Sequence, residues 1–105
     1  MEKKPFQLQL KIVWFKNCLG LAIDHIVLGQ NYSLTPYYFW PKTEAWEQLK
    51  LELDSKLWLS QEEKIRILKI TGDVMNYWAS FRHIKTTKDS FIEDFPEVAI
   101  LTLNN

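Results

Sequence analysis

The chain has 105 residues, of which 47% are hydrophobic and 14% aromatic, and its 13 basic and 13 acidic side chains cancel to a net charge of zero. This length fits one domain with a modest core, and the balanced charge excludes the basic surplus of a typical nucleic-acid binder. A single cysteine excludes an internal disulfide and a thiolate zinc site, and without an apolar run of about 18 residues no membrane partner is expected.

The first predicted element is a β-hairpin. Residues 7–15, QLQLKIVWF, alternate with the period of a half-buried strand. Residues 19–28 form a second apolar run after a turn, so an antiparallel pairing of the two is the simplest arrangement. Gly20 marks a bulge or a close approach of another segment, and a loop is predicted from Gly29 onward. The first strand divides into an apolar face, Leu8, Leu10, Ile12 and Trp14, and a mixed face, Gln9, Lys11, Val13 and Phe15.

Four consecutive aromatic residues follow in the stretch LTPYYFWPKTEAW, between Pro36 and Pro41. Each proline fixes its own backbone and biases the preceding residue away from helix, so this segment is predicted to be extended. Most of its rings should pack between the sheet and the helices. Four adjacent side chains cannot all face inward, so one or two should lie at the surface, where they would stack on bases or anchor a protein partner. We assign the four as protein contacts: Tyr37, Tyr38, Phe39 and Trp40.

A short helix is predicted after Pro41, starting at an acidic segment that suits the positive end of the helix dipole. Thr43 is the expected cap. Trp46, Leu49 and Leu53 have the spacing of an inward-facing stripe.

A longer helix is predicted from Ser60 to about Phe81. Ser60 and Glu63 have the spacing of a capping box, and the helical period continues through the segment. Its apolar arc is wider than one packed face requires, which predicts contacts on two sides, with the sheet and with the shorter helix. Its polar stripe contains two pairs at i,i+4 spacing, Glu62 with Arg66 and Lys69 with Asp73.

The remainder of the chain is acidic and ends in VAILTL, residues 98–103, which has strand character. This run is expected to add a third strand to the hairpin, or to order against a partner. The predicted fold class is therefore α+β: a small antiparallel sheet packed on two helices, in the order ββαα with a further β at the C-terminal side. We predict one globular domain over residues 1–82 and an extension over 83–105.

The residues that would carry catalysis are not brought together by the sequence pattern. His25 and His83 are the only histidines, and neither has a second ligand or triad partner at the required spacing. The three glycines are scattered, so no phosphate-binding loop is formed. We expect no enzyme activity, no metal site, no cofactor and no small-molecule substrate.

Several motifs resemble one known family. GLAIDHIV, LTPYYFWPKTEAWEQLKLELDSKLW and the SQEE helix start, in this order, are similar to the plastid-specific ribosomal protein three family of chloroplasts and cyanobacteria. The resemblance covers about residues 14–78. It departs from the family pattern at Leu57, where a proline is expected, and the segment after Phe81 matches no family pattern.

The resemblance implies a structural constituent of the 30S small subunit of a chloroplast or cyanobacterial ribosome, active in translation without catalysis. Its implied partners are 16S ribosomal RNA and neighbouring small-subunit proteins. Because the opening MEKKPFQ lacks the character of a transit peptide, we expect a plastid-encoded protein of the chloroplast stroma, with the cyanobacterial cytoplasm as the alternative.

Basic residues cluster near the start of the chain and again after the long helix. Since few acids accompany them in sequence, we predict that they contact RNA phosphates. The alternative function is a non-ribosomal adaptor that docks proteins through YYFWP and the acidic helix, with no role for RNA. The predicted RNA-binding residues are Lys3, Lys4, Lys11, Lys16, Arg82, Lys85 and Lys88.

Overall fold

The computed structural model describes residues 6–82 and 87–101. Four strands come first and helices follow, and the first two strands form the predicted N-terminal hairpin, which confirms the α+β class. The elements, in chain order, are β1 (Leu8–Trp14), β2 (Leu19–Val27), β3 (Gln30–Ser33), β4 (Tyr38–Trp40), α1 (Ala45–Asp54), α2 (Gln61–Phe81), α3 (Thr87–Asp94) and β5 (Ala99–Leu101).

The strands form one sheet in the order β3-β2-β1-β5, and β4 also pairs with β2. β1 and β2 are antiparallel, with Ile12 opposite Leu21. β5 supplies the expected C-terminal strand, and it lies parallel to β1, with Ile100 beside Ile12. The sheet is therefore antiparallel except at this edge, where the chain returns after three helices. Residues 102 and 103 of the predicted strand lie outside the described residues.

The predicted loop after Gly29 is shorter than expected, because β3 pairs with β2 through a two-residue turn. Leu28 and Gly29 occupy this turn with positive φ angles of 50° and 78°. A two-residue hairpin turn of type I′ requires positive φ angles at both of its central residues. Leu28 is almost fully exposed there.

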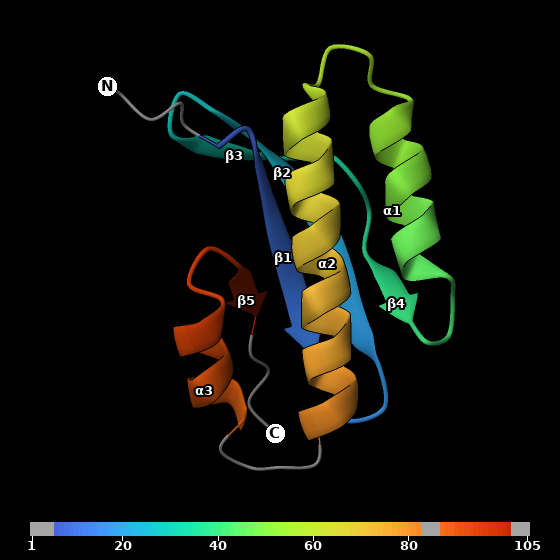
Figure 1. The fold of residues 1–105 in the computed structure, drawn as a ribbon, viewed down its shortest axis with the longest axis vertical. Helices are drawn as coiled ribbons and strands as arrows, with labels where there is room; N and C mark the ends of the chain where they lie inside the picture. The colour runs from blue at the N-terminus through green and yellow to red at the C-terminus, as the bar shows by residue number, and fades with distance from the viewer. Residues whose placement is uncertain (1–5, 83–86, 102–105) are drawn as a thin grey trace.

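The core lies between one face of the sheet and the helices, which stand in front of the sheet in Figure 1. The alternation of β1 places its apolar face in this core. α2 contributes Ile67, Val74 and Trp78, all almost completely buried. α3 packs on the same side of the sheet, since the ring of Phe91 lies 5.4 Å from that of Trp14, centroid to centroid.

α1 packs beside α2 and the sheet through Leu49 and Leu53, both fully buried as predicted. The half-buried Trp46 donates a hydrogen bond from Nε1 to the carbonyl of Leu68 at 2.9 Å. The prediction that Thr43 caps this helix is wrong. Glu44 is the N-cap, without a side-chain bond, and the hydroxyl of Thr43 donates instead to the carbonyl of Phe39 at 3.0 Å.

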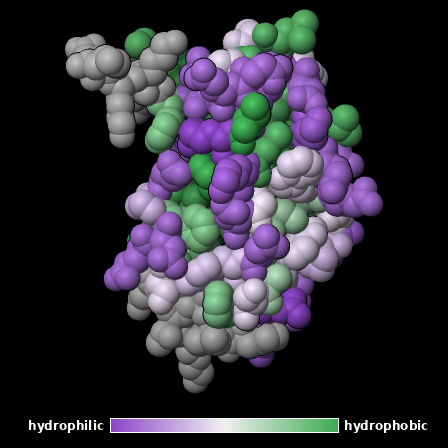
Figure 2. Space-filling view, viewed as in Figure 1, coloured by the Kyte–Doolittle hydropathy of each residue, from purple (hydrophilic) through white to green (hydrophobic). Residues whose placement is uncertain are grey.

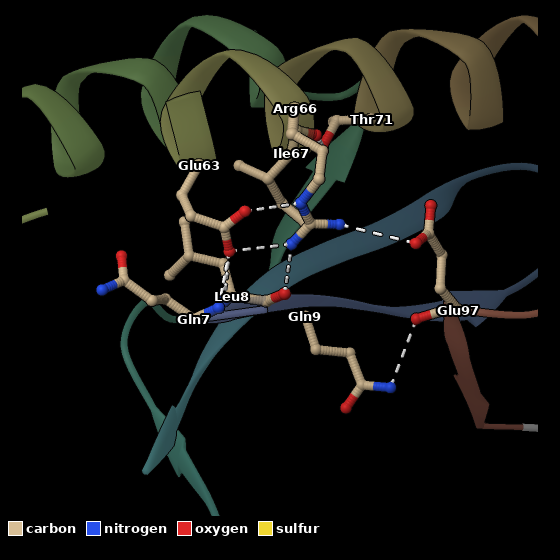
Figure 3. A network of polar contacts seen from close by, with 8 residues as sticks. All are labelled: Gln7, Leu8, Gln9, Glu63, Arg66, Ile67, Thr71 and Glu97. Atoms are coloured by element: carbon tan, nitrogen blue, oxygen red, sulfur yellow. Dashed lines mark hydrogen bonds and ion pairs between the residues drawn. The ribbon is translucent and has the colours of Figure 1, made fainter. Parts of the chain in front are cut away.

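α2 begins at the predicted cap, where the Ser60 hydroxyl accepts the backbone N–H of Glu63 at 3.2 Å. The Glu63 carboxylate does not complete the capping box. It accepts the backbone N–H groups of Gln7 at 2.6 Å and Leu8 at 3.1 Å, and so ties the start of β1 to the helix (Figure 3). Burial acts to raise the pKa of Glu63, but the hydrogen bonds from Arg66 and from these backbone groups outweigh it and lower the pKa.

Arg66 completes this network, and its pairing differs from the prediction. It contacts Glu63 at 2.7 Å, one turn back on the helix, rather than Glu62. It also donates to the carbonyl of Leu8 at 2.7 Å and lies 3.6 Å from the carboxylate of Glu97 (Figure 3). The other predicted pair, Lys69 with Asp73, is present at 3.1 Å.

Candidate functional site

The helices described in the structure leave the second face of the sheet uncovered. Strand alternation brings Val13, Gly20 and Ala22 to this face. All three are buried although no described helix covers them, and the ring of Phe39 lies against Gly20. We name this surface the helix-free face, and its rings are those of Phe15, Tyr37 and Phe39.

Phe39 lies at the centre of the helix-free face, opposite Gly20 in the pairing of β4 with β2. A Cβ atom at Gly20 would approach Cε1 of Phe39 to 2.9 Å, so the glycine gives the ring room to lie against the sheet. This is the close approach that the sequence predicted. Phe15 and Tyr37 flank the ring at centroid distances of 6.3 Å and 6.4 Å, the latter stacked.

A shallow groove runs beside the Phe15 and Phe39 rings. Its remaining lining comes from the turn between β1 and β2 and from the segment after β4. Lys16 and Lys42, both exposed, contribute the charge, and no described carboxylate lines the groove. Neither lysine forms an ion pair with another described residue. The groove therefore combines two aromatic rings with unneutralised positive charge.

Lys11 also lies on the helix-free face, but it already forms an ion pair with Asp24. Its Nζ atom is 2.7 Å from a carboxylate oxygen of Asp24 and 5.4 Å from the ring centre of Tyr37. The expectation that the N-terminal lysines have no acid nearby is thus wrong for Lys11, because antiparallel pairing brings β2 alongside β1. Lys11 holds Tyr37 in place and has less charge to offer a phosphate.

Two further predicted RNA contacts lie on or next to helices. Arg82 lies at the end of α2 with its guanidinium over the Trp78 ring, 4.8 Å from its centre. Lys88 belongs to α3. Lys3, Lys4 and Lys85 lie outside the described residues. Of the predicted contacts whose side chains the structure describes, Lys11 and Lys16 lie on the helix-free face and Arg82 does not.

The four predicted protein-contact aromatics divide between two sides of the sheet. Tyr38 and Trp40 turn toward the helices and pack against the core. The Trp40 ring meets that of Trp78 at 5.6 Å, and the Tyr38 hydroxyl donates to Glu52 at 3.3 Å. Burial, and then the Glu52 carboxylate, raise the pKa of Tyr38. Tyr37 and Phe39 remain for recognition, in keeping with the expectation of one or two surface rings.

Two groups of residues were missed by the sequence analysis. Lys42 follows Pro41 as a single lysine, and only the pairing of β4 with β2 brings it next to Lys16. Leu57 and Trp58, in the connection between α1 and α2, are 90% and 58% exposed. The apolar surface at the top of Figure 2 lies over this connection. A run of apolar residues directly before the Ser60 cap was the signal that could have indicated it.

His25 is half-buried, with its ring centre 4.8 Å from that of Trp58, and Asp24 is on the opposite face of the sheet with Lys11. His25 therefore lies at the edge of the core, on the opposite face of the sheet from the neighbouring carboxylate, and forms no dyad with it. Among the described residues, no cluster of three or more His, Cys, Asp or Glu side chains is suited to hold a metal ion. None of the helices in this part of the chain is long and apolar enough to cross a membrane.

Comparison with known proteins gives consistent matches. Residues 34–80, which contain β4, α1 and all but the last residue of α2, match the family described as "Plastid and cyanobacterial ribosomal protein (PSRP-3 / Ycf65)". The chain is 38% identical over 91 residues to a Synechococcus sp. (strain JA-3-3Ab) protein named "Probable small ribosomal subunit protein cS23", covering 87% of this chain and 91% of that protein.

Plastid relatives are similar to the same degree. The small ribosomal subunit protein cS23 of Gracilaria tenuistipitata var. liui is 37% identical over 94 residues, which is 90% of this chain and 94% of that protein. The protein cS23y of Arabidopsis thaliana is 42% identical over 79 residues, 74% of this chain and 43% of the longer plant protein. The similarity therefore extends over nearly the whole of the Synechococcus and Gracilaria proteins.

Proposed function

Because the chain belongs to the plastid and cyanobacterial ribosomal protein family (PSRP-3 / Ycf65), we propose that it is a structural constituent of the small ribosomal subunit in contact with 16S ribosomal RNA and neighbouring proteins. The family resemblance of the sequence motifs is thus confirmed. Membership implies a structural role in translation without catalysis. The observation that carries the proposal is the match to cS23 proteins over almost their full length.

The charge distribution supports the RNA contacts. A protein with no net charge can still bind RNA through one basic surface while its acidic surface meets basic neighbours. Lys16 and Lys42 form such a surface beside the groove on the helix-free face. The acidic side chains of α1, Glu47, Glu52 and Asp54, lie on a different element. We propose that Lys16 contacts phosphate, together with Lys3, Lys4, Arg82, Lys85 and Lys88.

The cellular setting follows from the relatives, which come from cyanobacteria and plastids. We propose the chloroplast stroma as the site of action, with a plastid gene as the source, and the cyanobacterial cytoplasm as the alternative. Tyr37 and Phe39 are the candidate contacts for a neighbouring molecule. If the protein were instead a free adaptor without a role for RNA, its complexes should survive RNase treatment.

Sedimentation of the tagged protein through a sucrose gradient tests the proposal. After ribosomes are dissociated at low magnesium, the protein should comigrate with the small subunit and should leave that fraction after RNase treatment. A protein that stays at the top of the gradient under low and high salt contradicts the proposal. Comigration with a complex that survives RNase would favour the adaptor.

The individual cations can be tested by substitution. Lys16→Ser should weaken association with the small subunit and reduce its salt dependence, by about 0.7 in the slope of log K against log salt for each single-strand phosphate that is no longer neutralised. Lys69→Ser is the matched control, since Lys69 is exposed on α2 and already paired with Asp73. Equal salt slopes for the two variants would show that Lys16 does not contact a phosphate in the interface.

A further inference from the structure

The groove beside Phe15 and Phe39 has the features of a binding site for a single nucleotide. Its walls are two half-buried rings, and its rim carries Lys16 and Lys42. Asn17, also exposed, adds a side-chain amide that can donate and accept hydrogen bonds. Flat apolar surface, positive charge and a polar group are thus presented together.

The rings are held in place from below and from the side. Gly20 lets Phe39 rest on the backbone of β2, and Val13 lies next to Gly20 on the paired strand. Tyr37 stacks against Phe39 at an interplanar angle of 29°, and Lys11, which is paired with Asp24, lies over Tyr37. A ring fixed on a strand by such contacts loses little freedom when a ligand stacks on it.

The chemistry of the groove favours nucleic acid over protein. An apolar protein anchor would use the rings but leave the two lysines without partners. An unpaired nucleotide offers a π-face to the rings and phosphates to the lysines, and stacking on aromatic side chains combined with backbone contacts is the usual mode of single-strand binding. In a duplex the face of each base is covered by the neighbouring base pairs, so no base is available to stack on the rings.

We infer that the helix-free face binds an unpaired nucleotide of ribosomal RNA, with its base stacked on Phe39 and Phe15 and its flanking phosphates at Lys16 and Lys42. This inference rests on the proposed RNA-binding function and assigns it to a specific surface. It moves Phe39 from the protein contacts to the RNA contacts, and it adds Lys42 and Phe15.

Binding of a fluorescent single-stranded oligouridine to the purified full chain, measured by anisotropy over a range of salt concentrations, tests the inference. Phe39→Leu keeps an apolar cover over Gly20 but removes the π-face. It should weaken binding about 5- to 150-fold, the range expected for the stacking of one base, with the salt slope unchanged. Lys16→Ser combined with Lys42→Ser should lower the salt slope by about 1.4, for two phosphates.

Matched variants control for general effects. Tyr32→Leu removes an exposed ring from β3, and Lys50→Ser removes an exposed cation from α1 that is paired with Asp54. Both should bind oligouridine as the unmodified chain does. A blunt-ended duplex of two RNA strands, in which every base is paired, should bind more weakly than oligouridine and should not respond to Phe39→Leu.

Crosslinking provides a second measurement that needs no variant and so does not depend on whether Phe39→Leu folds. An oligonucleotide containing 4-thiouridine should crosslink to peptides that contain Phe15 or Phe39. Crosslinks confined to other peptides, or equal oligouridine affinity for Phe39→Leu and the unmodified chain, would overturn the inference. Loss of a neighbouring ribosomal protein from the Phe39→Leu subunit, with RNA affinity intact, would show a protein site instead.

These outcomes separate the inference from the proposed function. If the unmodified protein sediments with the small subunit while Phe39→Leu binds oligouridine equally well, the function stands and the stacking site is rejected. If the unmodified protein never sediments with the subunit, the ribosomal function is rejected, whatever the oligonucleotide shows.

Discussion

Glu63 shows how a single side chain takes a role other than the one its spacing indicates. The sequence pairs it with Ser60 in a capping box, yet its carboxylate accepts two backbone N–H groups at the start of β1 and an ion pair from Arg66. Gln7 lies just ahead of the β1–β2 ladder and Leu8 is its first residue, and their N–H groups need an acceptor. A carboxylate already fixed at the start of a helix supplies one.

Glu63→Gln should therefore destabilise the protein in a pH-dependent way. At neutral pH we expect a loss of about 1.5–3 kcal/mol, the usual worth of hydrogen bonds to a charged group. Because the pKa of Glu63 is lowered in the folded state, its contribution is complete above the unfolded pKa, about 4.3, and is lost as the pH falls through the folded value. Urea denaturation over this pH range should show the two proteins converging in stability.

The neighbouring Glu62 is the control for this experiment. It is exposed, so Glu62→Gln should change the free energy of unfolding by less than about 0.5 kcal/mol at any pH. A difference between Glu63→Gln and the unmodified chain that stays constant from neutral to acidic pH would contradict the assigned role.

Gly20 is the second residue whose identity is set by a contact. Gly20→Ala would place a Cβ atom 2.9 Å from the Phe39 ring and 3.4 Å from Cβ of Val13. We expect the ring to shift and the protein to lose about 1–3 kcal/mol, as in other overpacked sites. Thermal denaturation measures the loss. An unchanged melting temperature would mean that the ring moves aside without cost.

Among the elements, α2 contains a glycine, Gly72, whose replacement by alanine should stabilise the protein, in contrast to Gly20→Ala. Gly72 lies within this helix, and a Cβ atom there would meet only Nε1 of Trp46, at 3.9 Å. Gly72→Ala should stabilise the protein by about 0.5–1 kcal/mol, because glycine costs conformational entropy in a helix interior. The same denaturation experiment should therefore give shifts of opposite sign for the two glycines, and a destabilised Gly72→Ala would refute the account of free space beside Trp46.

Elements with strong local signals were predictable from the sequence. β1, β2 and α2 have clear periodicity, and a cap marks the start of α2. β3 and α3 were not predicted. The four residues of β3 are all exposed and carry no apolar pattern, so their strand state depends on pairing with β2. α3 is short, and Phe91, the one fully buried side chain described in it, contacts partners far away in sequence.

The candidate site was predictable only in part, for the same reason. Alternation within β1 put Phe15 and Lys11 on one face, and the prolines indicated an extended aromatic segment. Which of the four rings faces outward depends on the register of β4 against β2, and this is set by tertiary packing such as the contact of Trp40 with Trp78. Lys42 became a candidate only once this register was known.

At the scale of the whole molecule, the described part of the C-terminal segment belongs to the same core as the rest. The division at residue 82 stays a prediction. Phe91 is fully buried, and its ring contacts those of Trp14, Tyr77 and Phe95. Val98 is also part of the core. α3 and β5 thus complete the core at the β1 edge of the sheet, on the opposite side of α2 from α1 (Figure 1).

Phe91→Ala tests this dependence. Removal of a buried phenylalanine should cost about 3–5 kcal/mol, through reduced burial and the cavity left behind. Ile92→Ala, on the exposed side of the same helix, should cost under about 1 kcal/mol. Chemical denaturation gives both values. Equal, small losses would mean that α3 adds little to the stability of the domain.

The parallel pairing of β1 with β5 also has a consequence for how the protein is made. β1 is synthesised before the other described elements, and one of its two edges is completed only by Ala99–Leu101. During translation β2 follows directly and pairs with the other edge, whereas the outer edge keeps its hydrogen-bonding groups open until the last described strand has been added. The nascent chain must therefore carry an unfinished sheet until β5 has been synthesised.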